Sequence, residues 1–189
     1  MKKAFIITGA QNSGNHLMTD ILIVNGCYGE IGRNQNCFDY MKRGNSPIVW
    51  RGSMPKGGIG WYNLKNISDV FENYGYAVQV IVMIRDWYAV KKTQTIHFPG
   101  LIKNEEVSLS AIKRAYKKIM GDVIKYDMDY YFVSYEGLIH NKNESILAIS
   151  QFIDYRLDPQ LIHITNENLK HYEGLKTIQE EGVKNVLCM

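Results

Sequence analysis

The sequence has few cysteines and no long apolar run, and each shortage excludes a class of protein. Cys27, Cys37 and Cys188 are odd in number and lack Cys-x-x-Cys spacing. This pattern predicts reduced thiols, a cytoplasmic location and no zinc site. The apolar runs are far too short to cross a bilayer, and the run after Lys2 and Lys3 is too short for a signal peptide. We therefore expect no membrane partner.

The sequence also has almost no excess of charge. There are 22 lysines and arginines against 19 aspartates and glutamates, which leaves a formal net charge of +3. So small an excess does not indicate general binding to nucleic acid, although a local basic site for an anionic ligand is compatible with it. The 189 residues contain no repeat, linker or low-complexity segment, so we expect a single domain over residues 1–189.

Strands and helices are expected to alternate along the chain. The apolar runs that indicate strands are 4–8, 47–51, 77–85 and 129–138, the last running into a turn. The segments with helical periodicity are 14–25, 67–75, 87–96, 108–127 and 143–153. Residues 26–46 are rich in Gly and Asn and are expected to be loop. This alternation predicts a three-layer α/β/α fold with a central parallel sheet, whose ligands bind beyond the carboxyl ends of the strands.

The stretch from Gly9 to His16 follows the first expected strand and leads into the first helix. A turn of this kind binds anions through unpaired amides at the helix N-terminus, where the helix dipole adds positive potential. Gly9 and Gly14 permit a tight turn and close approach of a phosphate, and Ser13, Asn15 and His16 add side-chain donors. We predict a phosphate site here, with a plain strand-to-helix turn as the alternative.

This loop lacks the lysine that ATP-binding loops carry. Gly9 and Gly14 have the spacing of Gly-x-x-x-x-Gly-Lys-Ser/Thr, but Asn15-His16 stands in place of Lys-Ser/Thr. The lysine that bridges the terminal phosphates and the hydroxyl that binds magnesium are both missing. The loop therefore favours a phosphate ligand without a β,γ-triphosphate bridge.

Several segments resemble the sulfotransferase superfamily, whose donor is 3′-phosphoadenosine 5′-phosphosulfate. "ITGAQNSGNHL" is similar to the family's strand, Gly-x-x-x-Ser-Gly and helix. "VIVMIRDWYAVKKTQ" is similar to its Arg-Asp-Pro-x-Asp-Val-x-x-Ser segment. "YYFVSYEGLI" and the following "ISQFIDYRLD" resemble its Tyr-Glu-Asp-Leu strand end and the next helix. The segments stand in the family's order, and the resemblance implies a P-loop NTPase-like fold and a sulfotransferase that needs no metal.

The resemblance also implies a role for each part of the site. Arg85 and Thr93 would bind the 3′-phosphate of the donor, for which arginine offers a charge-assisted, bidentate grip. Arg51 or Lys56, in "WRGSMPKGG", would steady the transferred sulfonate. The acceptor would be a hydroxyl or amine of a sugar or small metabolite. The loop residues that would bind the 5′-phosphate are Gln11, Asn12, Ser13, Gly14, Asn15 and His16. An alternative for Arg85 is a surface ion pair with Asp86.

Two departures from the family pattern concern the chemistry. Asn12 stands where the family has a lysine or arginine, so a hydrogen bond from Asn12 to the leaving group carries no charge. Ser53 stands where cytosolic members have a histidine base, which leaves His16 and His97 as candidate bases. Two other functions stay open: a nucleotide or nucleoside kinase-like enzyme on the same fold, and a non-catalytic nucleotide-binding module. The sequence indicates no oligomeric state.

Overall fold

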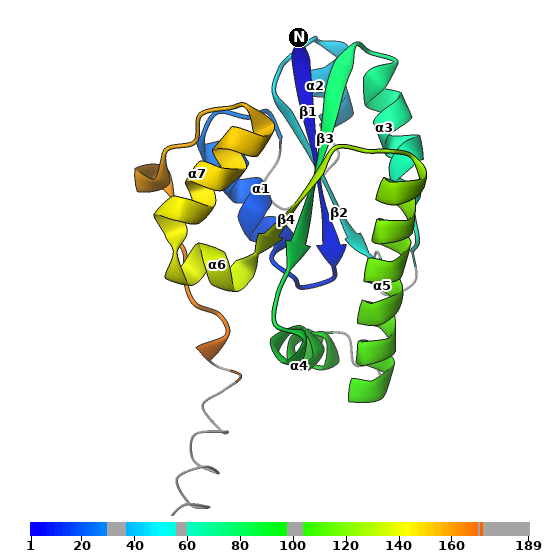
Figure 1. Ribbon diagram of the computed structural model, residues 1–189, viewed down its shortest axis with the longest axis vertical. Helices are drawn as coiled ribbons and strands as arrows, with labels where there is room; N and C mark the ends of the chain where they lie inside the picture. The colour runs from blue at the N-terminus through cyan, green and yellow to red at the C-terminus, as the bar shows by residue number, and fades with distance from the viewer. Residues whose placement is uncertain (30–36, 56–59, 98–103, 170, 172–189) are drawn as a thin grey trace, which may run out of the picture.

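The central feature of the molecule is a parallel sheet. A computed structural model describes residues 1–29, 37–55, 60–97, 104–169 and 171. Within these residues four strands form one sheet in the order β2-β1-β3-β4 (Figure 1). They are β1 (Lys2–Ala10), β2 (Ile48–Met54), β3 (Tyr76–Ile84) and β4 (Tyr130–Ser134). Because every neighbouring pair is parallel, the carboxyl ends of all four strands reach the same edge of the sheet.

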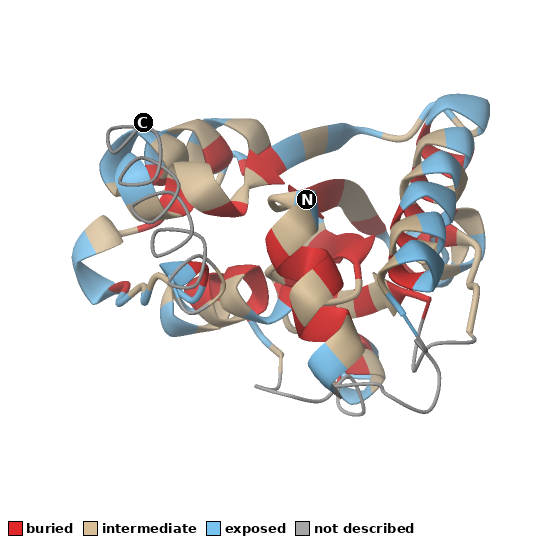
Figure 2. Ribbon diagram, turned by 90° about the horizontal axis from the view of Figure 1, so that it is seen from below, coloured by how far each residue is buried: buried red, intermediate tan, exposed pale blue. Residues whose placement is uncertain are grey.

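Helices cover both faces of this sheet (Figure 1). One face carries α1 (Asn15–Val24), α6 (Tyr135–His140) and α7 (Lys142–Ile153). The other carries α2 (Cys37–Lys42), α3 (Leu64–Glu72) and α5 (Glu105–Lys125). Figure 2 shows α5 buried along the side turned to the sheet and exposed along the other. In the described part of the chain, no helix has the length and apolar character needed to cross a bilayer.

The core lies on both sides of β1, which is buried from Ala4 to Ala10. Phe5 and Ile7 pack in the cluster that contains α1 and α7, whereas Ala4 and Ile6 pack in the cluster that contains α3 and α5. Successive side chains of a strand point to opposite faces, so an apolar run without alternation fits a strand covered on both faces. The run of uncharged residues that predicted β1 is therefore explained by the position of this strand inside the sheet, with helices on both faces.

Three expectations about the elements are wrong in part. Residues 26–46 are not loop throughout, because α2 buries Cys37 and Met41, which are four residues apart and lie on one helical face. The turn expected after β4 is α6, whose first turn is capped by Ser134 accepting from the amide of Gly137. β2 continues to Met54, three residues further than the expected strand. After Pro159–Leu161, a 3₁₀ turn, the chain has no further strand among the described residues.

The connections create a crevice at the carboxyl edge between β1 and β3. The chain leaves β1 for α1 on one face, and leaves β3 for α4 (Trp87–His97) and then α5 on the other. Neighbouring parallel strands with connections on opposite faces leave such a crevice, where ligands of open α/β sheets bind. Figure 1 shows α4 lying beyond this edge of the sheet, so the loop after β1, the end of β3 and α4 surround one place.

Candidate functional site

The loop from Gly9 to Gly14 has a backbone that tolerates few substitutions. A Cβ atom on Gly9 would lie 2.4 Å from Ser13 Oγ and 2.5 Å from the carbonyl oxygen of Met83. Asn12 has a left-handed backbone with φ 69°, a conformation that asparagine adopts more readily than most residues. Gly14, with φ 101°, precedes α1, and no side chain caps this helix. The first amides of α1 therefore lack side-chain acceptors, as an anion site requires.

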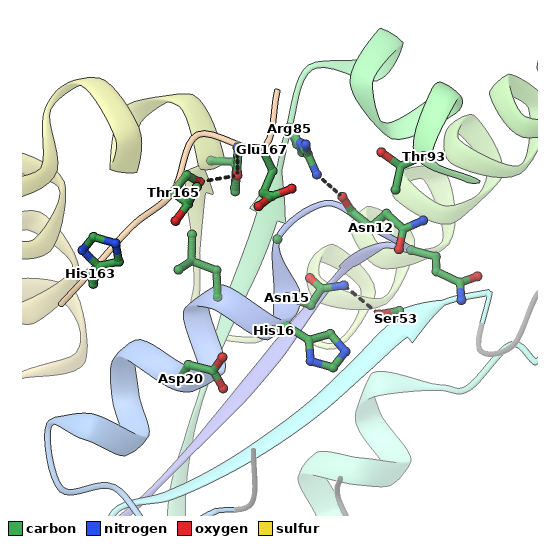
Figure 3. Close-up of a pocket in the computed structure, with 14 residues that line it drawn as sticks. Asn12, Asn15, His16, Asp20, Ser53, Arg85, Thr93, His163, Thr165 and Glu167 are labelled. Carbon is green, nitrogen blue, oxygen red and sulfur yellow. Dashed lines mark hydrogen bonds between the residues drawn. The ribbon is translucent and has the colours of Figure 1, made fainter. Parts of the chain in front are cut away.

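Two polar side chains of the loop turn inward and brace it. Ser13 is fully buried and donates to Asn15 Oδ1 at 3.3 Å. Asn15, also buried, donates through Nδ2 to Ser53 Oγ at 2.9 Å and to the carbonyl of Ala10 at 3.3 Å. Figure 3 shows the bond from Asn15 to Ser53, which joins the loop to β2. The side chains of Ser13 and Asn15, expected to be donors for a ligand, are engaged within the protein.

A third brace comes from α4 and was not foreseen from the sequence. Gln94 is buried and donates through Nε2 to the carbonyl of Gln11 at 2.8 Å. Its own Oε1 accepts from Ser108 Oγ of α5 at 2.8 Å. These two hydrogen bonds connect the start of the loop, at Gln11, to α4 and through it to α5. In the sequence, Gln94 is only the neighbour of Thr93, and nothing in its local pattern signals the contact.

Arg85, at the end of β3, reaches the loop directly. Its Nη1 donates to the carbonyl of Asn12 at 3.1 Å (Figure 3), and its Nε donates to Asn168 Oδ1 at 2.7 Å. The guanidinium stacks on the ring of Tyr135 at 4.4 Å. The surface ion pair with Asp86 is absent among the described residues. Asp86 Oδ1 instead accepts from the amide of Ala89, in the first turn of α4.

Two buried donors at this point have no acceptor. They are Arg85 Nη2 and Asn12 Nδ2. A buried polar group without a partner costs roughly 1–3 kcal/mol, and more when it is charged. The two side chains come from neighbouring strand ends and line one cavity. The structure therefore holds unsatisfied donors where a phosphate ligand was predicted.

The opposite wall of the cavity comes from the chain after α7 and was missed in the sequence. Tyr135 Oη donates to the carbonyl of Thr165 and accepts from the amide of Glu167, both at 3.1 Å. Asn168 Nδ2 donates to Glu136 Oε1 at 2.8 Å. Tyr135 and Glu136 are the Tyr-Glu pair that resembles the family's strand end. That resemblance was the one sequence signal that could have indicated this wall of the cavity. Asn168, 83 residues after Arg85, carried no signal.

The cavity between these walls has a volume of about 490 Å³, in the range of small-molecule sites. Thr93 lines it from α4, and its Oγ1 donates to the carbonyl of Ala89 at 2.7 Å and lies 2.9 Å from His171 Nε2. The residues that line the cavity are Gln11, Asn12, Gly14, Asn15, His16, Leu17, Asp20, Ser53, Arg85, Thr93, Tyr135, His163, Thr165 and Glu167.

Three titratable or charged side chains lie together on the other side of the loop: His16 and Asp20 of α1, and Arg51 of β2. Arg51 Nη1 lies 2.7 Å from His16 Nδ1. Burial, and then the Arg51 charge, lower the pKa of His16 below its usual value. Because arginine can only donate, His16 Nδ1 accepts and its neutral form carries the proton on Nε2. Asp20, one turn further along α1, has its pKa raised by burial, against the opposing charges of His16 and Arg51.

The structure brings together most of the residues predicted for the site. Gln11, Asn12, Gly14, Asn15, His16, Arg85 and Thr93 line one cavity, and Ser13 lies beneath the loop. Arg51 lies within β2 and contacts His16. Lys56 is outside the described residues, and His97 ends α4 with its side chain undescribed. No group of three or more His, Cys, Asp or Glu side chains in the described ranges is arranged to hold a metal ion.

Comparison with known proteins identifies the fold. No protein-family model matches the chain, and no curated protein matches it by sequence. A sulfotransferase domain from the curacin biosynthetic pathway matches with a TM-score of 0.58 and 12% identity, over 85% of this chain and 77% of that one. A sulfotransferase domain from the olefin synthase of Synechococcus PCC 7002 matches with a TM-score of 0.53 and 15% identity, over 92% and 83%.

A crystal structure of mouse sulfotransferase SULT7A1 complexed with PAP has the same arrangement. It matches with a TM-score of 0.53 and 13% identity, and the aligned region covers 85% of this chain but 60% of the mouse protein. At these identities the likeness concerns the fold. The chain therefore has a diverged form of the sulfotransferase fold, which confirms the expected α/β class with a parallel sheet flanked by helices.

Proposed function

We propose that the protein is a sulfotransferase that moves a sulfonate from 3′-phosphoadenosine 5′-phosphosulfate to a hydroxyl or amine of a sugar or small metabolite. The observation that carries this proposal is the pair of buried donors without acceptors, Arg85 Nη2 and Asn12 Nδ2. Both side chains line the cavity beside the N-terminus of α1, which no side chain caps. An anionic ligand supplies acceptors to Arg85 Nη2, to Asn12 Nδ2 and to the first amides of α1. Hydrogen bonds to a charged acceptor are stronger than bonds between neutral groups.

The two phosphates of the donor occupy different parts of this cavity. The 5′-phosphosulfate lies on the loop and on the first amides of α1, where Asn12, Gly14 and His16 surround it. The 3′-phosphate lies between Arg85 and Thr93. The hydroxyl of Thr93 then exchanges its contact with His171 for a phosphate oxygen. Support for a donor of this type comes from the mouse protein of the same fold, which was crystallised with PAP.

In the transfer step, the acceptor oxygen or nitrogen attacks the sulfur and the bond from sulfur to the bridging oxygen breaks. The electron pair of that bond goes to the oxygen, which leaves as part of the 5′-phosphate. Asn12 Nδ2 donates to the leaving oxygen, although as a neutral donor it is weaker than a cation. Arg51 or Lys56 steadies the sulfonate from the side of β2. No metal is needed for this step.

The acceptor also loses a proton, and His16 can take it only if one of its ring nitrogens is free to accept. With Arg51 donating to Nδ1, the other ring nitrogen of His16 already carries its proton. His16 therefore serves as a hydrogen-bond donor in this arrangement, and acts as a base only after Arg51 leaves. Ser53 Oγ accepts from Asn15 and is no base by itself. His97 is the other candidate that we propose for this role.

The kinase-like alternative has no support in the geometry of the loop. The magnesium-binding hydroxyl would stand at position 16, where the chain has His16, and the lysine would stand at position 15, where Asn15 is buried against Ser53. The non-catalytic alternative has one observation in its favour, because Asn12 brings no charge to the leaving group. Binding and turnover must therefore be measured separately.

Isothermal titration calorimetry distinguishes the three functions. Adenosine 3′,5′-bisphosphate (PAP) should bind without metal, and ATP with magnesium should bind weakly. The reverse order would reject the sulfotransferase proposal in favour of a kinase-like enzyme. Incubation with ³⁵S-labelled phosphosulfate donor and a panel of sugars, phenols and amines then tests transfer. Tight binding of the bisphosphate with no labelled product from any acceptor would favour the non-catalytic module.

A further inference from the structure

Asp20 is a cavity residue to which the proposed reaction gives no role. It lies on α1 outside the apolar face of the helix, one turn beyond His16 (Figure 3). Its carboxyl lines the cavity, yet Oδ1 is buried and has no hydrogen-bond partner. The raised pKa of Asp20 follows from burial, which outweighs the attraction of the His16 and Arg51 charges. Asp20 Oδ1 is thus a buried acceptor without a donor, whereas Arg85 Nη2 and Asn12 Nδ2 are buried donors without acceptors.

The position of Asp20 restricts which part of a ligand could supply that donor. A carboxylate repels phosphate, so the anionic groups belong at the end of the cavity formed by Arg85 and the loop. The rest of a nucleotide must then extend along α1, past Leu17 and toward Asp20. From Gly14 to Asp20 the helix advances about 9 Å, at roughly 1.5 Å per residue. A 5′-phosphorus and the exocyclic nitrogen of the attached base are separated by a comparable distance.

The opposite side of this part of the cavity is compatible with a flat, neutral base. Thr165 is held by Tyr135 across the cavity from α1, and His163 lies on the same segment (Figure 3). Leu17 provides an apolar surface on α1. On the adenine base, the 6-amino group is the donor that can meet a carboxylate. Rotation about the terminal torsion of Asp20 exchanges its two oxygens, so either one can face the cavity.

We propose that Asp20 accepts a hydrogen bond from the exocyclic amine of the nucleobase and thereby selects adenine in the nucleotide site. This inference rests on the proposed function, because it needs the phosphates at the loop. It predicts weaker binding of a purine base that lacks this amine, because the base then offers the carboxylate no donor at that position. A site that leaves buried polar groups unpaired with the wrong ligand discriminates strongly.

The test compares PAP with the 3′,5′-bisphosphate of purine riboside, which lacks only the exocyclic amine of the base. Calorimetric titration of the full chain should show PAP binding at least about tenfold more tightly. Asp20→Asn should reduce the preference to less than about threefold, because a neutral amide loses the charge-assisted bond to the amine and costs less to leave unpaired. Asp39→Asn, the same change on an exposed position of α2, should leave the preference unchanged.

The outcomes separate this inference from the proposed function. Equal affinity of the wild-type protein for the two bisphosphates, or an unchanged preference in Asp20→Asn, overturns the role of Asp20 while binding itself stands. Absence of binding of either bisphosphate overturns both. Thermal unfolding of each variant confirms that the comparison concerns folded protein. Since Asp20→Asn removes a partly buried charge whose Oδ1 lacks a hydrogen bond, we expect it to unfold at a temperature no lower than the wild type.

Discussion

Replacement of Arg85 by alanine tests the central contact of the proposed site. In the free protein the guanidinium bonds to the carbonyl of Asn12 and to Asn168 and stacks on Tyr135, which leaves Nη2 for a ligand. A hydrogen bond to a charged group contributes about 1.5–3 kcal/mol. Loss of that contact corresponds to about 10- to 150-fold weaker binding of PAP. The carbonyl of Asn12 also loses its donor, so the loop becomes less ordered and the upper part of this range is expected.

A thermodynamic cycle assigns the loss to one phosphate. PAP and AMP differ only in the 3′-phosphate, so calorimetry with both ligands and both proteins isolates the contact between Arg85 and that group. The wild type should prefer PAP, and Arg85→Ala should bind the two ligands with nearly equal affinity. Arg85→Lys keeps the charge but lacks the fork that reaches Asn12 and Asn168 together, so an intermediate preference is expected. Arg156→Ala, an exposed arginine after α7, serves as the control. A preference for PAP that survives in Arg85→Ala would refute the assignment.

Three further predictions concern the loop and its surroundings, the first with a control at Gly121 of α5. Gly9→Ala should destabilise the protein by about 2–4 kcal/mol in urea titrations, because the new Cβ meets a backbone oxygen. Gly121→Ala, at an exposed helical position with open space, should instead stabilise it by about 0.5–1 kcal/mol. Gln94→Leu leaves the Gln11 carbonyl and Ser108 unpaired and should lower the free energy of unfolding by about 1–3 kcal/mol and weaken PAP binding; unchanged binding would show that the loop holds its shape without Gln94. Because the pKa of His16 is lowered in the folded protein, the unfolded protein binds more protons at His16 as the pH falls through its ordinary value of 6.5. Stability should therefore fall as the pH decreases through this value, and His16→Gln should reduce this slope in urea titrations.

The strands and the loop could be predicted because their signals are local. β1 and β3 are apolar runs without alternation, which is the pattern of strands covered on both faces. The turn after β1 has its glycines within one short stretch, and Arg85 comes directly after the longest apolar run. The parallel order of the strands then brings Arg85 to the loop, although 73 residues separate it from Asn12. Each step needed only the residue types and their spacing.

The contacts that hold the loop could not be predicted in the same way. Gln94 meets Gln11, and Arg85 meets Asn168, each across 83 residues. Nothing in the neighbourhood of Gln94 or Asn168 distinguishes them from exposed polar residues. The side chains of Ser13 and Asn15, whose types indicated ligand donors, also make hydrogen bonds within the protein that the sequence did not indicate. Sequence position shows that a polar residue lies in a loop, whereas its direction depends on the packing of distant elements.

The absence of a basic residue at position 12, where the sulfotransferase family has a lysine or arginine, has a physical explanation in the backbone of Asn12. Residue 12 takes a left-handed conformation with φ 69°, which is more easily adopted by asparagine than by lysine. In this conformation its carbonyl oxygen accepts from Arg85 Nη1, and its side-chain amide remains without a partner. The loop thereby acquires a cation from the end of β3. Because the guanidinium is fixed at Nε, at Nη1 and by Tyr135 before a ligand arrives, binding loses little of its conformational entropy. A flexible lysine in the loop would lose more on binding.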